Sequence, residues 1–263
     1  MADVPEHNTV VREAFTRQAV AYAANPGIAD PERVARLVRA VQPTAQDRVL
    51  EVATGPGYVA MGFAAVAREV IGVDLTEAPL ALAERRRQAQ GVVNLRFQVA
   101  EASQLPFAAG EFDVVVCRLA LHHFAQPLPM LREMVRVCRV DGTVAVEDLV
   151  VSEHPARGAY HNRFEHLRDA SHTSAHPVSR LLQLFVETQL EVEQVRTYPH
   201  IQVVEQWLTN AHTPEAAATE VRRLLTQDAQ HDLSGTRPWQ QATGAWCFTQ
   251  RNAIVVGRKL QHI

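Results

Sequence analysis

The sequence predicts an α/β fold in which a mostly parallel sheet carries helices on both faces. Strand-like and helix-like runs alternate between residues 46 and 150, which is typical of parallel strands joined by right-handed crossovers. The strand-like runs are short and largely apolar, as expected for strands buried on both faces. A glycine turn, Gly55-Pro56-Gly57, separates the first strand-like run from the next helix. Residues 46–150 therefore carry most of the fold prediction.

Two helices are predicted ahead of this core. The first covers residues 8–24, where helical spacing places four apolar side chains on one face: Val11, Phe15, Ala19 and Tyr22. The second begins after Asp30-Pro31, which combines a favourable N-cap residue with proline at the first helical position. We expect residues 1–45 to form a helical lid over the glycine turn.

The core itself is expected to alternate strand and helix from residue 46 to residue 150. The predicted strands are 48–53, 69–74, 94–99, 112–117 and 143–148. The predicted helices are 57–68, 77–90 and 128–139. Because ligands bind beyond the carboxyl ends of the strands in open parallel sheets, this segment is expected to hold the main ligand.

The rest of the chain is less regular. Residues 151–178 are polar and hold five of the twelve histidines. The further predicted elements are a helix over 179–189, a strand over 190–198, a helical segment over 203–229 and strand-like runs around 246–248 and 253–256. We expect residues 151–245 to be cap insertions interleaved with a sixth strand, and residues 246–263 to supply the final strand. The chain would then be one domain with a seven-stranded sheet.

Composition excludes several classes of protein. The net charge is −3, so no global basic field favours nucleic acid. No apolar run approaches the roughly 20 residues of a membrane span, and no signal peptide is visible. The three cysteines are far apart and odd in number, which favours reduced thiols. These observations predict a cytoplasmic protein with a small-molecule partner, whose oligomeric state stays open, a homodimer being one option.

The stretch from Val49 to Ala60 carries the strongest functional signal. It runs from an apolar strand with one carboxylate, Glu51, through the glycine turn into a helix. Gly55-x-Gly57-x-x-Ala60 also fits the dinucleotide fingerprint, so a nicotinamide-dependent oxidoreductase is one hypothesis. A pyrophosphate, however, gains nothing from a carboxylate inside the strand, whereas a ligand with an ammonium group or a cationic centre does.

Acidic residues also follow the next two strands. Asp74 ends the second strand, where a carboxylate can accept from two ribose hydroxyls, and Glu101 follows the third, where it can accept from an adenine amine. Together with Glu51, they describe an adenosine with a positive, amino-acid-like tail. That ligand is S-adenosylmethionine.

Residues 48–148 also resemble a class I S-adenosylmethionine-dependent methyltransferase of the ubiquinone/menaquinone-biosynthesis-like (methyltransferase type 11) group, which has a Rossmann-like fold. The matching runs are Val49-Leu-Glu-Val-Ala-Thr-Gly-Pro-Gly, Gly72-Val-Asp-Leu, Ala100-Glu-Ala-Ser-Gln-Leu-Pro-Phe, Phe112-Asp-Val-Val-Val-Cys and Leu121-His-His-Phe. Outside residues 8–148 and the last strands the resemblance is thin and does not identify the substrate.

The resemblance implies a role for each cofactor-binding residue. It implies that Glu51 holds the methionine end together with the turn residues Ala53, Thr54, Gly55 and Gly57. It implies that Asp74 holds the ribose, and that Leu75, Glu101 and Ala102 lie around the adenine. It also implies that the backbone near Arg118 lines the site and that Tyr22 is a lid tyrosine. Ala53 and Pro56 depart from the family's pattern, and both are tolerable if the backbone angle φ is negative there.

Methyl transfer to a hydroxyl needs a group that removes the proton, which favours a histidine or a carboxylate near the methyl. The candidates for catalysis are His123, Asp148, His166 and His172. His122 is a further candidate or a packing residue, and Glu147 should point away from Asp148 because neighbours on a strand alternate. No metal site is predicted, since the histidine spacing matches no ligand signature.

The activity predicted is O- or C-methylation of a small quinone-like, aromatic or natural-product-like acceptor. The alternatives are the nicotinamide-dependent oxidoreductase and a binding or non-methylating protein that keeps the methyltransferase fold.

Overall fold

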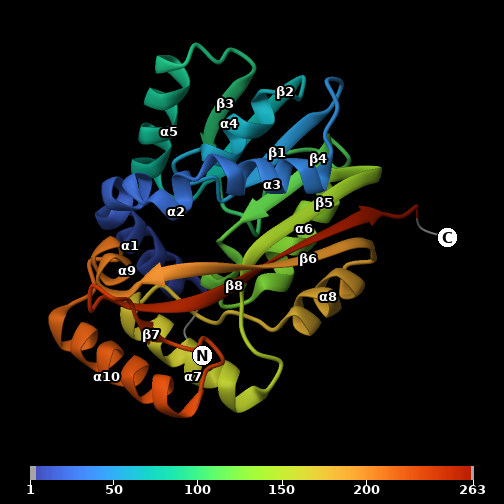
Figure 1. The fold of residues 1–263 in the computed structure, drawn as a ribbon. Helices are drawn as coiled ribbons and strands as arrows, with labels where there is room; N and C mark the ends of the chain where they lie inside the picture. The colour runs from blue at the N-terminus through green and yellow to red at the C-terminus, as the bar shows by residue number, and fades with distance from the viewer. Residues whose placement is uncertain (1–3, 262–263) are drawn as a thin grey trace.

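The computed structural model describes residues 4–261 and is built around one twisted sheet (Figure 1). Its strands are β1 (Arg48–Val52), β2 (Glu69–Asp74), β3 (Leu95–Val99), β4 (Phe112–Arg118), β5 (Cys138–Val150), β6 (Leu190–Val203), β7 (Trp239–Gln240) and β8 (Trp246–Lys259). They lie in the order β3-β2-β1-β4-β5-β8-β6, and the short β7 pairs with β8 off this path. The first five strands are parallel, while β8 runs antiparallel to both of its neighbours, β5 and β6.

Helices cover both faces of the sheet. They are α1 (Val4–Ala24), α2 (Pro26–Ala29), α3 (Pro31–Val41), α4 (Tyr58–Ala64), α5 (Glu77–Ala89), the 3-10 helix η1 (Leu121–His123), α6 (Pro127–Val137), α7 (Pro155–Arg168), α8 (Val178–Glu187), α9 (Val204–Asn210) and α10 (Glu215–His231). No helix in residues 4–261 is both long enough and apolar enough to cross a bilayer.

Two apolar layers hold these helices to the sheet. One face packs α6 and α8 through residues such as Met130, Met134 and Phe185, and the other packs α3 and α4 through Leu37 and Phe63. All five side chains are fully buried, and the apolar surface that they remove from water stabilises the fold. The predicted start of α3 is confirmed, because the Asp30 side chain accepts a hydrogen bond from the Glu32 amide and Pro31 follows it.

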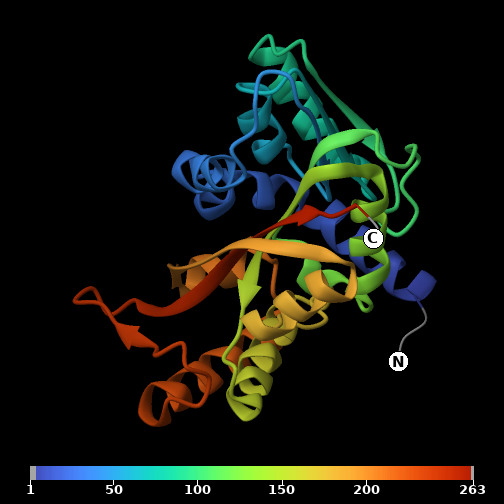
Figure 2. The same ribbon diagram turned by 90° about the vertical axis from the view of Figure 1, so that its right-hand side faces the viewer.

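A smaller unit lies beyond the sheet's main body. Helices α7 and α10 lie side by side at one end of the molecule in both views (Figures 1 and 2). Phe164 of α7, Trp207 of α9 and Phe248 of β8 pack edge to face at the centre of this unit. The far ends of β6 and β8 therefore carry a cap with a core of its own.

The predicted core agrees closely with the structure, but the predicted C-terminal part needs correction. The segment 151–178 contains a full helix, α7, and the helical segment over 203–229 is broken into α9 and α10. The strand-like runs around 246–248 and 253–256 form the single strand β8. The sequence predicted two short runs instead of one long strand because polar residues separate them. Two of these residues, Gln250 and Asn252, are buried within β8.

Candidate functional site

The glycine turn between β1 and α4 is held by three hydrogen bonds, two to β2 and one within the turn. The Thr54 amide donates to the Val73 carbonyl at 2.9 Å, and the Gly57 amide donates to the Thr54 carbonyl at 3.0 Å. The Gly55 amide donates to Oδ2 of Asp74 at 2.8 Å. Gly55 and Gly57 have φ of +51° and +80°, angles that glycine adopts without a steric cost. The turn is therefore rigid, and these N–H groups are committed within the protein.

Ala53, the residue before Thr54, also has a positive φ, of +56°. The expected negative φ is therefore not found at Ala53. Pro56, the other departure from the family's pattern, is not among the residues with a positive φ. A left-handed conformation costs a residue with a β-carbon roughly 1–2 kcal/mol. The turn tolerates that cost because it is anchored between β1 and α4 and hydrogen-bonded to β2.

Replacing Ala53 by glycine is expected to stabilise the protein by about 0.5–1 kcal/mol, because relief of this strain exceeds glycine's extra unfolded-state entropy. Urea unfolding monitored by circular dichroism measures the change. The matched control is Ala81→Gly at an exposed helical position of α5, where the same replacement should instead cost about 1 kcal/mol. A destabilised Ala53→Gly variant would show that the turn is not strained.

Glu51 is buried at the end of β1, with 2% of its surface exposed. Its Oε2 accepts hydrogen bonds from the Thr54 hydroxyl at 2.5 Å and from the Ala60 amide at 2.8 Å. Burial raises the pKa of Glu51 to about 8, although both hydrogen bonds oppose the rise. Burial also raises the pKa of Asp74, whose two oxygens accept from the Gly55 and Thr76 amides. The ionised form of both acids would therefore be stabilised by a ligand that donates hydrogen bonds or carries positive charge.

These acids belong to one cleft at the carboxyl ends of the strands. It contains about 1240 Å³ of empty space, part of it open to solvent. The residues predicted to hold the cofactor that line this cleft are Tyr22, Glu51, Ala53, Thr54, Gly55, Asp74, Leu75, Glu101, Ala102 and Arg118. Gly57 does not line it, because its Cα faces Phe97 and Ala83 behind the turn. Tyr22 lies over the glycine turn, and burial raises its pKa to about 12.

A second cavity, with about 660 Å³ of empty space, adjoins the cleft. The residues that line both are Phe15, Tyr22, Ile28, Leu119 and His123. Polar and apolar surface contribute about equally to the wall of the second cavity, which is built from the helices α1 to α3, η1, the strand ends and the cap. The two spaces therefore share wall residues from α1, α2, η1 and the residue after β4.

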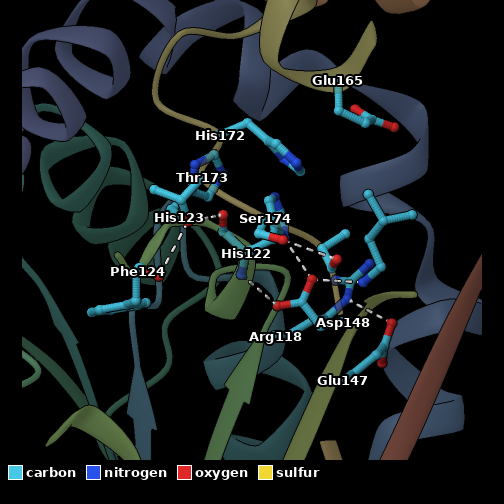
Figure 3. Close-up of polar contacts among 12 residues, drawn as sticks. Arg118, His122, His123, Phe124, Glu147, Asp148, Glu165, His172, Thr173 and Ser174 are labelled. Atoms are coloured by element: carbon cyan, nitrogen blue, oxygen red, sulfur yellow. Dashed lines mark hydrogen bonds and ion pairs between the residues drawn. The ribbon is translucent and has the colours of Figure 1, made fainter. Parts of the chain in front are cut away.

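The end of β5 holds an ion pair on one face and a histidine–aspartate hydrogen bond on the other (Figure 3). Arg118 Nε lies 3.2 Å from Oε1 of Glu147, whose carboxylate also accepts from the Tyr198 hydroxyl. On the other face, Nδ1 of His122 lies 2.5 Å from Oδ1 of Asp148. The expectation that Glu147 points away from Asp148 is confirmed. Asp148 lines neither cavity itself, and His122 lines the second one.

The remaining histidine candidates lie in different surroundings. His123 lines both cavities, and its Nδ1 lies 3.1 Å from the Ser171 carbonyl oxygen. Burial, followed by the neighbouring His122, lowers the pKa of His123 to about 4. His172 is buried with Nε2 2.8 Å from Oδ1 of Asn162, and His166 is exposed with Nδ1 bonded to the His172 backbone. Neither His166 nor His172 lines either cavity. The cap does face the second cavity, but it does so through other residues.

Sequence reasoning missed several residues of that wall. Arg33, Glu165, Gln250 and Asn252 line the second cavity and are each at most 6% exposed. The available signal was the position of Gln250 and Asn252 between two apolar runs of β8, 246–248 and 253–256, where polar side chains are seldom buried. Within residues 4–261, no group of three or more histidine, cysteine, aspartate or glutamate side chains is arranged to hold a metal ion.

Known proteins resemble this chain along most of its length. Residues 50–146 match the model of a family described as a methyltransferase domain. An uncharacterized methyltransferase of Bacillus subtilis, YcgJ, is 30% identical over 212 residues, which cover 81% of this chain and 83% of YcgJ. The chain belongs to the S-adenosylmethionine-dependent methyltransferases.

Solved structures agree with this membership and confirm the predicted Rossmann-like fold. The crystal structure of YcgJ matches the methyltransferase with a TM-score of 0.83 and 26% identity, over 88% of this chain and 99% of that one. A putative methyltransferase from Bacillus halodurans gives a TM-score of 0.82 at 26% identity, over 88% and 100% of the two chains. A demethylmenaquinone methyltransferase of Renibacterium salmoninarum is 28% identical over 175 residues, 66% of this chain and 69% of that protein.

Proposed function

We propose that this methyltransferase moves the methyl group of S-adenosylmethionine to oxygen or carbon of a small-molecule acceptor. The observation that carries the proposal is the shared wall between the acid-lined cleft and the second cavity. One space suits the methyl donor and the other suits the acceptor. The demethylmenaquinone methyltransferase among its relatives acts, by its name, on a quinone precursor, which supports an aromatic acceptor.

The residues of the cleft fit this methyl donor. Glu51 would face the ammonium group of its methionine end, and Asp74 would accept from the ribose hydroxyls with the lone pairs that its two backbone bonds leave free. Leu75 and Ala102 would flank the adenine, and Glu101 would accept from its amine. Tyr22 and the rest of residues 1–45 would close the cleft as a lid, while residues 151–245 would cap the acceptor.

The same contacts argue against a nicotinamide dinucleotide. A pyrophosphate needs free backbone N–H groups at the turn, but those of Thr54, Gly55 and Gly57 are bonded to protein oxygens. The first helical turn of α4 also gives the Ala60 amide to Glu51. An anionic ligand would in addition face the buried acids Glu51 and Asp74.

The chain's own contribution to the chemistry is orientation and exclusion of water. When bound, S-adenosylmethionine supplies an electrophilic methyl on a sulfonium that loses its charge in the reaction. Holding an acceptor in line with such a methyl can contribute roughly 7–11 kcal/mol to the barrier reduction. The shared residues, Phe15 and Ile28 among them, are largely apolar and would keep the transfer path dry.

Calorimetry with S-adenosylmethionine, S-adenosylhomocysteine and NADH tests the cofactor. We expect binding of the first two; tight NADH binding without a response to S-adenosylhomocysteine would exclude the proposal. Labelled S-adenosylmethionine with a broad acceptor panel then tests transfer. Binding without any methylated product would favour a non-methylating protein on this fold.

Asp74→Ala is expected to weaken S-adenosylhomocysteine binding at least fivefold, about 1 kcal/mol or more, because a charge-assisted hydrogen bond is lost. Calorimetry on the folded variant measures it. Glu193→Ala, which removes an exposed acid on β6, is the matched control and should bind normally. Unchanged affinity in folded Asp74→Ala would mean that the ribose lies elsewhere.

A further inference from the structure

The polar wall of the second cavity is a built feature of the cap. Its members come from α7 and its C-terminal end, from β6 and from β8: Glu165, Arg168, Asp169, His200, Gln202, Gln250 and Asn252. Glu165, Gln250 and Asn252 are only 3%, 6% and 2% exposed. Side chains of these types are seldom buried, so a wall of them indicates a site made for a polar molecule.

Two buried donors on residues that line this cavity have no hydrogen-bond partner within residues 4–261: Nδ2 of Asn252 and Nε of Arg33 on α3. Buried donors are nearly always paired, so an oxygen atom of a bound molecule could accept the missing hydrogen bond from each of these two groups. The positive charge of Arg33 favours a carboxylate or a polarised carbonyl over a hydroxyl. Aromatic side chains in the same cavity, Phe15, Tyr22 and Trp207, suit a flat ring.

A histidine oriented by a carboxylate lies in the same cavity. Nδ1 of His122 lies against the carboxylate of Asp148 (Figure 3). Because a carboxylate only accepts, the neutral imidazole carries its hydrogen on Nδ1 and its lone pair on Nε2. Asp148 is itself held by the backbone amides of Leu149, at 2.6 Å, and His122, at 3.3 Å. A base fixed by a third group in this way is the arrangement that activates hydroxyl nucleophiles in enzymes.

We propose that the second cavity binds a small phenol carrying a carboxylate or carbonyl group, that Arg33 and Asn252 hold that group, and that His122 is the catalytic base for its hydroxyl. The proposal rests on the function proposed above. Asp148 is then a positioning residue. The phenol oxygen gains a bond to the methyl carbon, the sulfur–carbon bond breaks with its electron pair staying on sulfur, and the phenol proton passes to Nε2 of His122 and then to solvent.

Basicity distinguishes His122 from its neighbour. Burial lowers the pKa of His122, but the charge and hydrogen bond of Asp148 outweigh burial and the net shift is upward. His123 titrates far lower, at about 4, and is the weaker proton acceptor. The titratable groups near His122 are Asp148 on β5, His123 on η1, Glu165 on α7, and Asp169, His172 and His176 after α7.

Binding of probe compounds tests the acceptor class without turnover. Enzyme saturated with S-adenosylhomocysteine is titrated by calorimetry with salicylate, 3,4-dihydroxybenzoate, unsubstituted phenol and a prenylated hydroquinone. We expect a carboxylated phenol to bind best and Asn252→Leu or Arg33→Met to weaken it at least tenfold, with S-adenosylhomocysteine affinity unchanged. Preference for phenol or the prenylated compound, or unchanged affinity in both variants, would overturn the inference. Failure of S-adenosylhomocysteine to bind would instead reject the proposed function.

The role of His122 has its own readouts. With the best acceptor, His122→Gln should lower kcat about 100-fold or more, as loss of a general base does, and leave S-adenosylhomocysteine binding unchanged. The control His231→Gln removes an exposed histidine at the end of α10 and should not alter kcat. NMR titration should place the pKa of His122 above its ordinary value, and Asp148→Asn should lower it and move the acid limb of kcat/KM with it. A loss below tenfold in His122→Gln, or an acid limb that Asp148→Asn does not move, would contradict the assignment.

Discussion

Glu51→Gln is expected to weaken S-adenosylhomocysteine binding about 100-fold. Glutamine keeps an oxygen that can accept from Thr54 and Ala60, so the turn is preserved while the charge is removed. Removing one partner of a buried, hydrogen-bonded charge pair typically costs roughly 2–5 kcal/mol, and each 1.4 kcal/mol is about tenfold in affinity. Calorimetry at constant pH measures the change, and affinity within threefold of the unmodified protein would exclude Glu51 as the partner of the ligand's ammonium group.

The raised pKa of Glu51 gives this prediction a second readout. A carboxyl group with a pKa of about 8 is protonated in the free protein at neutral pH and must ionise to pair with an ammonium group. Affinity should therefore rise as pH increases toward about 8, by up to tenfold per unit, and Glu51→Gln should remove that dependence.

Stability should move the other way in the free protein. Between the ordinary value of 4.5 and about 8, the folded protein holds a proton at Glu51 that the unfolded chain releases. The contribution of Glu51 to the free energy of unfolding therefore falls as pH rises through that window. The Glu51→Gln variant should not show this decrease. Urea unfolding at several pH values measures the difference between the two proteins.

The half of the molecule proposed to bind the cofactor could be predicted from sequence because its signals are local. The apolar runs of β1 and β2, the turn at Gly55 and the acid at Asp74 each follow from spacing and residue type within one strand–turn–helix unit. Parallel strands then bring their carboxyl ends together, so Glu51, Asp74 and Glu101 meet in one cleft although they are far apart in the chain.

The half proposed to bind the acceptor could not be predicted because its contacts are long-range. The Gln202–Gln250 bond joins β6 to β8, and Glu165 on α7 accepts from Gln250. Polar residues that are buried by such pairings resemble a solvated loop or a surface strand when only their neighbours in sequence are known. His122 and His123 show the same limit, because adjacent histidines differ only through the partners, Asp148 and Ser171, that the fold supplies.

Gly57→Ala is expected to destabilise the protein by about 3 kcal/mol. Part of that loss is the left-handed strain at φ +80°, roughly 1–2 kcal/mol for a residue with a β-carbon. The remainder is crowding, since a Cβ on Gly57 would lie 2.7 Å from Cζ of Phe97 and 2.8 Å from Cβ of Ala83. The Phe97 ring can swing aside, but the short side chain of Ala83 moves only with α5, and such overpacking costs about 1–3 kcal/mol.

Gly91→Ala separates the two contributions. Gly91 also has a positive φ, of +65°, but a Cβ there would meet no atom within 4 Å. This control should lose only the strain, about 1 kcal/mol, so the difference between the variants measures the crowding behind the turn. Urea unfolding with unchanged m-values gives both numbers. Equal losses would mean that α5 and β3 yield to the new methyl group. A larger loss at Gly57 would show instead that Phe97 and Ala83 pack too tightly behind the turn to admit a methyl group.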